Sequence, residues 1–210
     1  MEPRRVLKWA SVLSILALLA VLLVDRPLAV ALQPSARQAQ AATGPAMHVL
    51  ELAFGFPISK FLTGAVLLLA AAALFPFRRY RRAAWLLTLL GLAQLTTRLA
   101  AGVLKNVFLR PRPFEALDTG AWDFFTAGSS FPSGHAAHFW PFFFVSMLAF
   151  PRWRIPLLVL AIAVSISRVV VNDHFLGDVL GSAAIAALVS YGYGRWIVPR
   201  MPVPRVAAAS

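Results

Sequence analysis

Apolar runs close to the length needed to cross a lipid bilayer restrict this fold more than any other feature of the sequence. A membrane-spanning helix needs about 20 mostly apolar residues, because its backbone polar groups must pair within the helix when no water is available. Six such runs, separated by charged and turn-forming residues, cover positions 9–24, 58–75, 83–104, 134–150, 155–171 and 176–198. The sequence therefore predicts an all-α polytopic membrane protein, with residues 1–210 forming a single domain built as a six-transmembrane-helix bundle.

The composition agrees with a membrane protein and excludes several other classes. Hydrophobic residues make up 60% of the 210 residues and charged residues 13%, against roughly 45–50% and 25% in soluble domains. Cysteine is absent from the sequence, which excludes disulfides, thiol nucleophiles and cysteine-bound metals. The formal net charge of +12 would favour nucleic-acid binding in a soluble protein. Here the basic residues form short, dispersed clusters, and we expect no nucleic-acid partner.

The positive charges predict how the bundle is oriented. If six helices alternate across the bilayer, both termini and two short loops lie on the same side. Basic residues are enriched on cytoplasmic sides of membrane proteins, so both termini are predicted to be cytoplasmic. The side that holds the termini carries most of the basic residues: Arg4, Arg5, Lys8, Arg78, Arg79, Arg81, Arg82, Arg152, Arg154, Arg195, Arg200 and Arg205.

The N-terminal part of the chain has two interpretations. Its first apolar run is either a retained helix or a cleaved signal peptide, because a basic segment precedes it and Ala29-Val30-Ala31 resembles a cleavage site. Residues 33–45, rich in Pro, Ala and Gln, are expected to form an external loop. Either way, the chain from residue 45 onward starts outside, and the orientation of the remaining helices is the same.

Three polar clusters interrupt the apolar sequence, and the predicted topology brings them together. Each cluster lies where a predicted helix meets the external face, so we expect them to form one site. The clusters are Lys105 with Arg112 and Pro113; Pro132, Ser133, Gly134 and His135; and Ser167, Arg168, His174 and Asp178.

The residue types in these clusters favour an anionic ligand. Lys105, Arg112 and Arg168 are cations at the mouth of an apolar bundle, where unpaired charge is costly. Ser133 and Gly134 read as the start of a helix, whose first N–H groups point outward and favour anions. A phosphate group satisfies both features, and such cations stabilise the charge that develops during phosphoryl transfer.

The remaining polar residues suggest a nucleophile and an acid. His174 and Asp178 are four residues apart and share a face if the last helix already includes them. The carboxylate would then hold one ring nitrogen while the other attacks. His135, arriving from another helix, is placed to protonate the leaving oxygen.

These residues resemble the three-part signature of the type 2 phosphatidic acid phosphatase superfamily, whose integral-membrane branch has six spans. The resemblance covers about residues 83–198, and all three clusters match it in order and spacing. It implies that His174 forms a phosphohistidine, that Asp178 holds its tautomer and that His135 acts as acid and then as base. It also implies that no metal or other cofactor is needed. The residues expected to hold the phosphoryl oxygens are Lys105, Arg112, Ser133, Gly134 and Arg168.

The same resemblance implies a metal-independent lipid phosphatase in a bacterial inner membrane, with its site facing the periplasm or exterior. Its partners would be the bilayer and a phospholipid or polyprenyl phosphate substrate. Undecaprenyl diphosphate, phosphatidylglycerol phosphate, phosphatidic acid and lipid A phosphates all fit, with a slight preference by analogy for the first two. Two alternatives stay open: a phosphotransferase with an alcohol acceptor, and a non-catalytic lipid-binding or transport protein.

Three residues near the motifs are not part of the signature. His138 follows His135 by three residues, and a structural role is favoured over a metal site. Arg110 either assists a second phosphate or is a solvated charge. Arg98 lies about two helical turns before Lys105 and either lines the interior or pairs with a polar group there.

Overall fold

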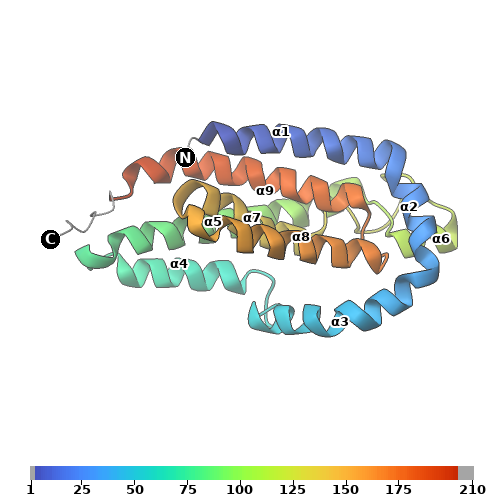
Figure 1. The fold of residues 1–210 in the computed structure, drawn as a ribbon, viewed down its shortest axis with the longest axis horizontal. Coiled ribbons are helices and arrows are strands. Elements are labelled where there is room, and N and C mark those ends of the chain that lie inside the picture. Colours follow the sequence, from blue (N-terminus) through green and yellow to red (C-terminus); the bar gives the residue numbers. More distant parts are fainter. Residues whose placement is uncertain (1–2, 203–210) are drawn as a thin grey trace.

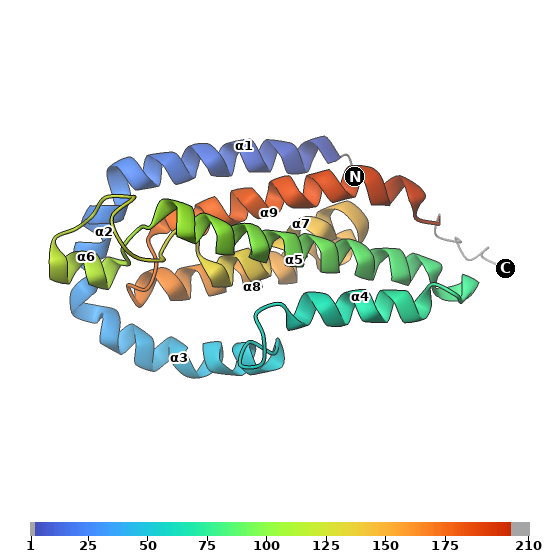
Figure 2. The ribbon, with the colours of Figure 1, turned by 180° about the vertical axis from the view of Figure 1, so that it is seen from behind.

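The computed structural model describes residues 3–202, and the elements in this part of the chain are all helical. Six of the described helices lie along one axis, and each runs opposite to the one before it in this set (Figures 1 and 2). They are α1 (Pro3–Leu19), α4 (Leu62–Leu74), α5 (Arg81–Phe108), α7 (Gly134–Ala149), α8 (Arg154–Val170) and α9 (Leu176–Ile197). α1 therefore begins at the end of the bundle where α9 finishes, and the all-α prediction is confirmed.

Within residues 3–202, four helical stretches are long and apolar enough to cross a membrane: Arg4–Ala53, Arg78–Thr119, Pro151–Val170 and Leu176–Arg200. α4 is shorter, with 13 residues, and α7 has 16. Large apolar side chains such as Leu23, Leu69 and Trp196 are exposed on the outside of the bundle. A soluble protein would rarely expose apolar surface on this scale, so the chain is an integral membrane protein.

The core of the bundle is centred on α7. This helix packs against α5, α8 and α9, and α1 packs along α9. Phe139, Phe144 and Val145 of α7 are fully or almost fully buried. α9 supplies small residues, among them Ala183 and Ala187, and small residues allow helices in membranes to approach closely. The first helix is therefore an integral part of the packed bundle.

The region between the first and second predicted spans differs from the prediction. Residues 33–45 are helical, not an external loop: π-helix η1 (Ala20–Val24), α2 (Asp25–Leu32), the 3-10 turn η2 (Gln33–Ser35) and α3 (Ala36–Ala53) follow α1 without a break. Ala and Gln favour helix, and Pro34 lies in the first turn of η2, where its missing N–H costs nothing. The other predicted runs correspond to α4, α5, α7, α8 and α9, with ends that differ by at most four residues.

The segments that connect the long helices determine which end of the bundle holds the polar clusters. α6 (Pro113–Thr119) packs against α2, and both cover the end of the bundle away from the start of α1 (Figures 1 and 2). The 3-10 turns η3 (Arg78–Tyr80), η4 (Pro151–Trp153) and η5 (Val198–Arg200) lie in the half that contains the start of α1. Arg205, one of the predicted cytoplasmic charges, lies outside the described residues.

Gly91 lets α4 and α5 approach closely. A Cβ added at Gly91 of α5 would lie 2.9 Å from the side chain of Leu68 and 3.0 Å from the backbone oxygen of Gly64. A Cβ at Gly102 of the same helix would meet no atom within 4 Å. Gly91 is therefore closely packed against α4, whereas Gly102 of the same helix has open space beside it.

Gly91→Ala is expected to lower the melting temperature in detergent, because forcing an extra methyl into packed helices costs roughly 1–3 kcal/mol. Gly102→Ala is the matched control and should leave the melting temperature unchanged or raise it, since alanine is the better helix former. A Gly91→Ala protein as stable as the control would contradict this packing.

Candidate active site

Two predicted phosphate-binding arginines converge on a carboxylate that the sequence motif does not contain. Arg112 Nη1 donates to Asp173 Oδ1, and Arg168 Nη2 donates to Asp173 Oδ2. The same Oδ2 lies 3.9 Å from His174 Nε2. The structure therefore joins the first and third polar clusters through an anionic group held beside the imidazole.

Asp173 is ionised in this setting. Burial alone would raise its pKa, but His174 when it is protonated, together with Arg168 and Arg112, outweighs burial and lowers the pKa to about 2. Paired guanidinium groups that converge on two oxygens form the arrangement that also binds phosphate. Asp173 thus marks a position where the protein stabilises negative charge, one residue before the histidine of the motif.

His174 lies in the connection between α8 and α9. Helix α9 begins only at Leu176, with Phe175 as its N-cap, so the assumption that His174 shares a helical face with Asp178 is wrong. The chain instead turns back and places His174 Nδ1 3.5 Å from Asp178 Oδ2. Nδ1 faces the carboxylate, and Nε2 is left on the side of Asp173.

Burial keeps His174 neutral. Only 3% of its side chain is exposed, and burial lowers its pKa below 6.5, against the opposing effect of Asp178. A neutral imidazole has an unprotonated ring nitrogen, which is the form that attacks an electrophile. One ring nitrogen of His174 is therefore unprotonated at neutral pH.

The loop before α7 contacts both Asp178 and Lys105 through hydrogen bonds. Ser130 Oγ donates to Asp178 Oδ2 and lies 3.4 Å from His174 Nδ1, while the Phe175 N–H donates to Asp178 Oδ2 at 2.9 Å. Lys105 Nζ donates to the backbone oxygens of Ser129 and Ser130. Its ammonium group is thus held next to the serine that contacts the His–Asp pair.

The start of α7 joins the second cluster to the third. Ser133 N donates to the backbone oxygen of Asp178 at 3.2 Å, and the Ser133 hydroxyl caps the helix by accepting from Ala136 N. The first N–H groups of a helix have no intrahelical partner, so they can bind an anion. Gly134 also makes room for Arg98, which donates to its backbone oxygen; Arg98 therefore pairs with a polar group.

His135 carries a partner that the sequence analysis missed. Its Nε2 lies 2.8 Å from Glu51 Oε1 at the end of α3, and Phe56 stacks on its ring with 5.2 Å between centroids. Because Glu51 is far away in sequence, no local pattern pointed to it. The Glu51 carboxylate can accept a hydrogen bond from the Nε2–H of the ring, which fixes the tautomer and orientation of His135.

His138 has a packing role. Its Nδ1 lies 2.9 Å from Gln94 Nε2, and the rings of Phe54 and Phe139 surround it. Within residues 3–202, no group of three or more His, Cys, Asp or Glu side chains is placed to hold a metal ion. The structural interpretation of His138 agrees with these contacts.

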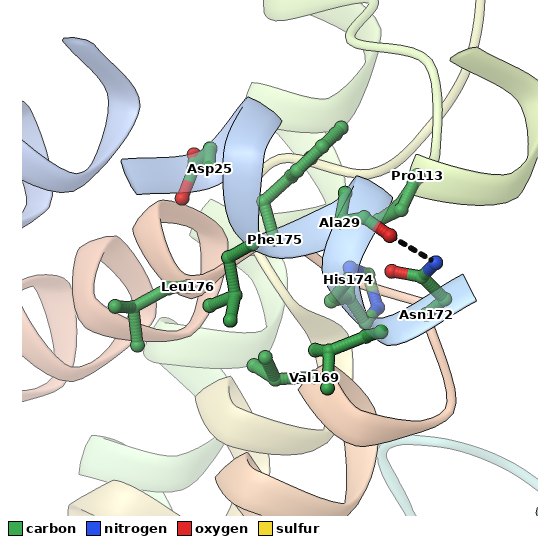
Figure 3. Close-up of a pocket in the computed structure, with 10 residues that line it drawn as sticks. Asp25, Ala29, Pro113, Val169, Asn172, His174, Phe175 and Leu176 are labelled. Carbon is green, nitrogen blue, oxygen red and sulfur yellow. Dashed lines mark hydrogen bonds between the residues drawn. The ribbon is translucent and has the colours of Figure 1, made fainter. Parts of the chain in front are cut away.

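Arg110 differs from both predicted roles, since it neither faces solvent nor remains available for a second phosphate. It is buried and donates to Asp178 Oδ1 at 2.7 Å and to Asp25 Oδ2 at 2.8 Å. Asp25 and His174 line the same narrow pocket, shown in Figure 3. A carboxylate of α2, absent from the predicted site, therefore belongs to its surroundings.

A cleft of about 570 Å³ with a mixed polar and apolar lining lies next to these residues, between η2, the start of α3, α6 and the end of α8. Two of its lining residues adjoin the reaction centre along the chain, because Phe114 follows the Arg112-Pro113 pair and Asn172 precedes Asp173. Its polar and aromatic lining includes Gln33, Arg37, Gln40, Phe114 and Asn172.

Two curated proteins are similar to the chain over most of their length. The "Lipid A 1-phosphatase" of Rhizobium johnstonii is 29% identical over 201 residues, which cover 88% of this chain and 79% of that protein. The protein of the same name from Rhizobium etli is 29% identical over 201 residues, covering 88% of this chain and 83% of its own length.

A solved structure shares the fold. The crystal structure of a transmembrane PAP2 type phosphatidylglycerolphosphate phosphatase from Bacillus subtilis matches with a TM-score of 0.53 and 22% identity, covering 98% of both chains. The family model of the PAP2 superfamily matches residues 82–202. This match spans more than half of the sequence and includes all three polar clusters, so the chain belongs to the PAP2 superfamily.

Proposed function

We propose that this protein is a membrane lipid phosphatase that works through a phosphohistidine on His174. The observation that carries the proposal is the placement of His174, whose Nδ1 faces Asp178 while its Nε2 faces the group bridging Arg112 and Arg168. A phosphoryl group that takes the place of the Asp173 carboxylate would lie in front of Nε2. Membership of a phosphatase superfamily agrees with this chemistry.

The proposed reaction has two steps, formation of the phosphohistidine and its hydrolysis. In the first, Nε2 of His174 forms a bond to phosphorus as the bond from phosphorus to the lipid oxygen breaks, and His135 gives that oxygen its proton. In the second, His135 takes a proton from water, whose oxygen attacks phosphorus and breaks the P–N bond. Inorganic phosphate leaves, and neutral His174 is restored.

The cations supply the electrostatic stabilisation. Lys105, Arg112 and Arg168, with the Ser133 hydroxyl and the Gly134 N–H, would surround the phosphoryl oxygens. Preorganised donors of this kind stabilise charge that develops in the transition state. The scheme therefore uses neither a metal nor another cofactor.

We also propose that α1, α4, α5, α7, α8 and α9 all cross the bilayer, with both termini in the cytoplasm. The basic groups at 78–82 and at Arg152 and Arg154 lie at the connections before α5 and α8, in the half of the bundle that contains the start of α1 (Figure 1). The site lies toward the other end. The positive-inside rule then puts the site on the periplasmic face of a bacterial inner membrane.

For the substrate, we propose a lipid whose phosphate is attached to a sugar head group. Both curated relatives bear the name lipid A 1-phosphatase, and polar side chains line part of the cleft beside the proposed reaction centre. Its amides can hydrogen-bond to hydroxyl groups, and Phe114 offers an exposed aromatic face. This head-group assignment replaces the slight preference for undecaprenyl diphosphate or phosphatidylglycerol phosphate.

His174→Ala is expected to reduce phosphate release from a lipid phosphate by at least about a thousandfold, because loss of a nucleophile removes most of an enzyme's rate. The assay uses purified protein in detergent with EDTA. His48→Ala, a substitution of an exposed histidine on α3, is the matched control and should keep wild-type activity. Equal rates for the two variants would rule out the proposed nucleophile.

The head group is tested by comparing kcat/KM for lipid A 1-phosphate with that for phosphatidylglycerol phosphate. The sugar lipid should be preferred, and Arg37→Ala should lower its kcat/KM roughly tenfold, the size of one lost charged hydrogen bond. Activity on the glycerol lipid should stay the same. Arg4→Ala, at the far end of α1, serves as the control. A preference for the glycerol lipid, or an equal loss on both substrates, would refute the assignment.

Asp173→Asn should strengthen inhibition by inorganic phosphate. The wild-type carboxylate competes for Arg112 and Arg168, so its neutralisation is expected to lower the inhibition constant about tenfold, or roughly 1.4 kcal/mol. Asp118→Asn removes an exposed charge from α6 and should leave the constant unchanged. An inhibition constant that rises in Asp173→Asn, or matches the control, would show that Asp173 does not occupy the phosphate position.

A further inference from the structure

Four buried ionisable side chains connect the N-terminal helical region to the proposed nucleophile. Their exposed fractions are 2% for Asp25, 3% for Arg110, 0% for Asp178 and 3% for His174. The first of them lies in α2, outside the residues that match the family model. The motifs account for Asp178 and His174 only.

The contacts between these side chains form an unbroken series. Asp25 Oδ2 accepts from Arg110 Nη2 at 2.8 Å, and Arg110 Nη1 donates to Asp178 Oδ1 at 2.7 Å. The other oxygen of Asp178 lies 3.5 Å from His174 Nδ1. The second oxygen of Asp25, Oδ1, accepts from the Gly177 N–H at 2.9 Å, so Asp25 also holds the first turn of α9.

The surroundings fix Arg110 between its two carboxylates. Its guanidinium carbon lies 3.9 Å from the ring centroid of Phe175 and 4.6 Å from that of Phe124. Gly177 has no side chain to push Asp25 away, since a Cβ there would lie 2.7 Å from Asp25 Oδ2. Close packing of this kind leaves the guanidinium a single position.

The charges of Asp25, Arg110 and Asp178 together determine the net charge that faces His174. A buried guanidinium paired with Asp178 alone would neutralise that carboxylate, and Asp178 would then stabilise positive charge on His174 less well. Asp25 balances Arg110, which leaves one net negative charge facing the imidazole. Positive charge develops on the ring when Nε2 bonds to phosphorus while Nδ1 keeps its proton.

We propose that Asp25 is a positioning residue of the active site, which acts through Arg110 to fix Asp178 and to preserve its negative charge toward His174. The proposal rests on the proposed role of His174 as nucleophile. It also requires that Asp25 be retained in the working protein, so cleavage at Ala29-Val30-Ala31 would contradict it. An intact mass of the purified protein checks this requirement directly.

Asp25→Asn keeps the shape and a hydrogen-bond acceptor for Gly177 while removing the charge. We expect kcat to fall at least tenfold and KM to change less than threefold, because the groups that bind phosphate are untouched. The acidic limb of the pH profile of kcat/KM should move to lower pH. With Arg110 unbalanced, the pKa of His174 falls, and the neutral nucleophile persists to lower pH.

The control for this experiment is Asp118→Asn, which removes an exposed carboxylate from the nearby helix α6. It should change neither kcat nor the acidic limb. The other ionisable groups that act on His174 are the same in both variants, so they cannot produce a difference; they are Lys105, His135, Asp173 and Asp178.

A double-mutant cycle separates positioning from a general structural effect. In an Asp178→Asn background, Asp25→Asn should cause little further loss of kcat, because its route to His174 is already broken. A full additional loss would overturn the proposal. Should Asp25→Asn fail to fold, Arg110→Lys provides the test, since a lysine cannot bridge two carboxylates as a guanidinium does; wild-type kcat in that variant would also overturn it.

Failure of this proposal is distinguishable from failure of the proposed function. If His174→Ala is inactive while Asp25→Asn matches the wild type in kcat and pH profile, the phosphatase mechanism holds and the role of Asp25 is refuted. If His174→Ala keeps its activity, the nucleophile itself is wrong.

Discussion

The buried carboxylate of Asp178 is the group on which the rest of the site depends. It is fully buried and touches Arg110, Ser130, the Phe175 N–H and His174. An uncompensated buried charge is strongly destabilising, by about 3–5 kcal/mol when a partner is removed. Meeting this requirement brings together the chain after α5, the loop before α7 and the start of α9. The same contacts leave one nitrogen of His174 facing the arginines.

A second carboxylate, Asp173, stabilises two of the cations in the site by pairing with both. Arg112 and Arg168 would repel each other if left alone, and Asp173 satisfies both. Because Asp173 offsets the repulsion between the two arginines, their guanidinium groups are held in a fixed orientation in the folded protein. Preorganisation of this kind is the main way that enzymes stabilise developing charge.

The sequence predicts the helices well because they depend on local patterns of apolar residues. Apolar runs gave the α4, α5, α7, α8 and α9 helices to within four residues, and Ser133 caps α7 as expected. The loop expected at 33–45 was wrong because Ala and Gln favour helix, and the helical segment accommodates Pro34 in the first turn of η2 and Pro45 inside α3. The expectation that His174 and Asp178 share a helical face was wrong because α9 begins only at Leu176. The two side chains meet through the turn that precedes this helix.

The residues that the sequence did not reveal are paired through tertiary contacts. Asp25 meets Arg110 across 85 positions, and Glu51 meets His135 across 84. Each is an acidic residue in or beside an apolar run, where only the folded chain shows its partner. Asp173 is adjacent to the motif, yet its role depends on two arginines from different segments. The part of the site that acts on the catalytic groups is thus less visible in sequence than the groups themselves.

The most direct test of this account is to identify the phosphorylated nitrogen. The wild-type protein would be mixed with lipid phosphate, quenched in alkali within milliseconds and mapped by mass spectrometry, with isomer-specific detection of phosphohistidine. The account predicts phosphate on Nε2 of His174, because Nδ1 is held by Asp178. Phosphate on Nδ1, on His135, or on no histidine at any time point during turnover would contradict it.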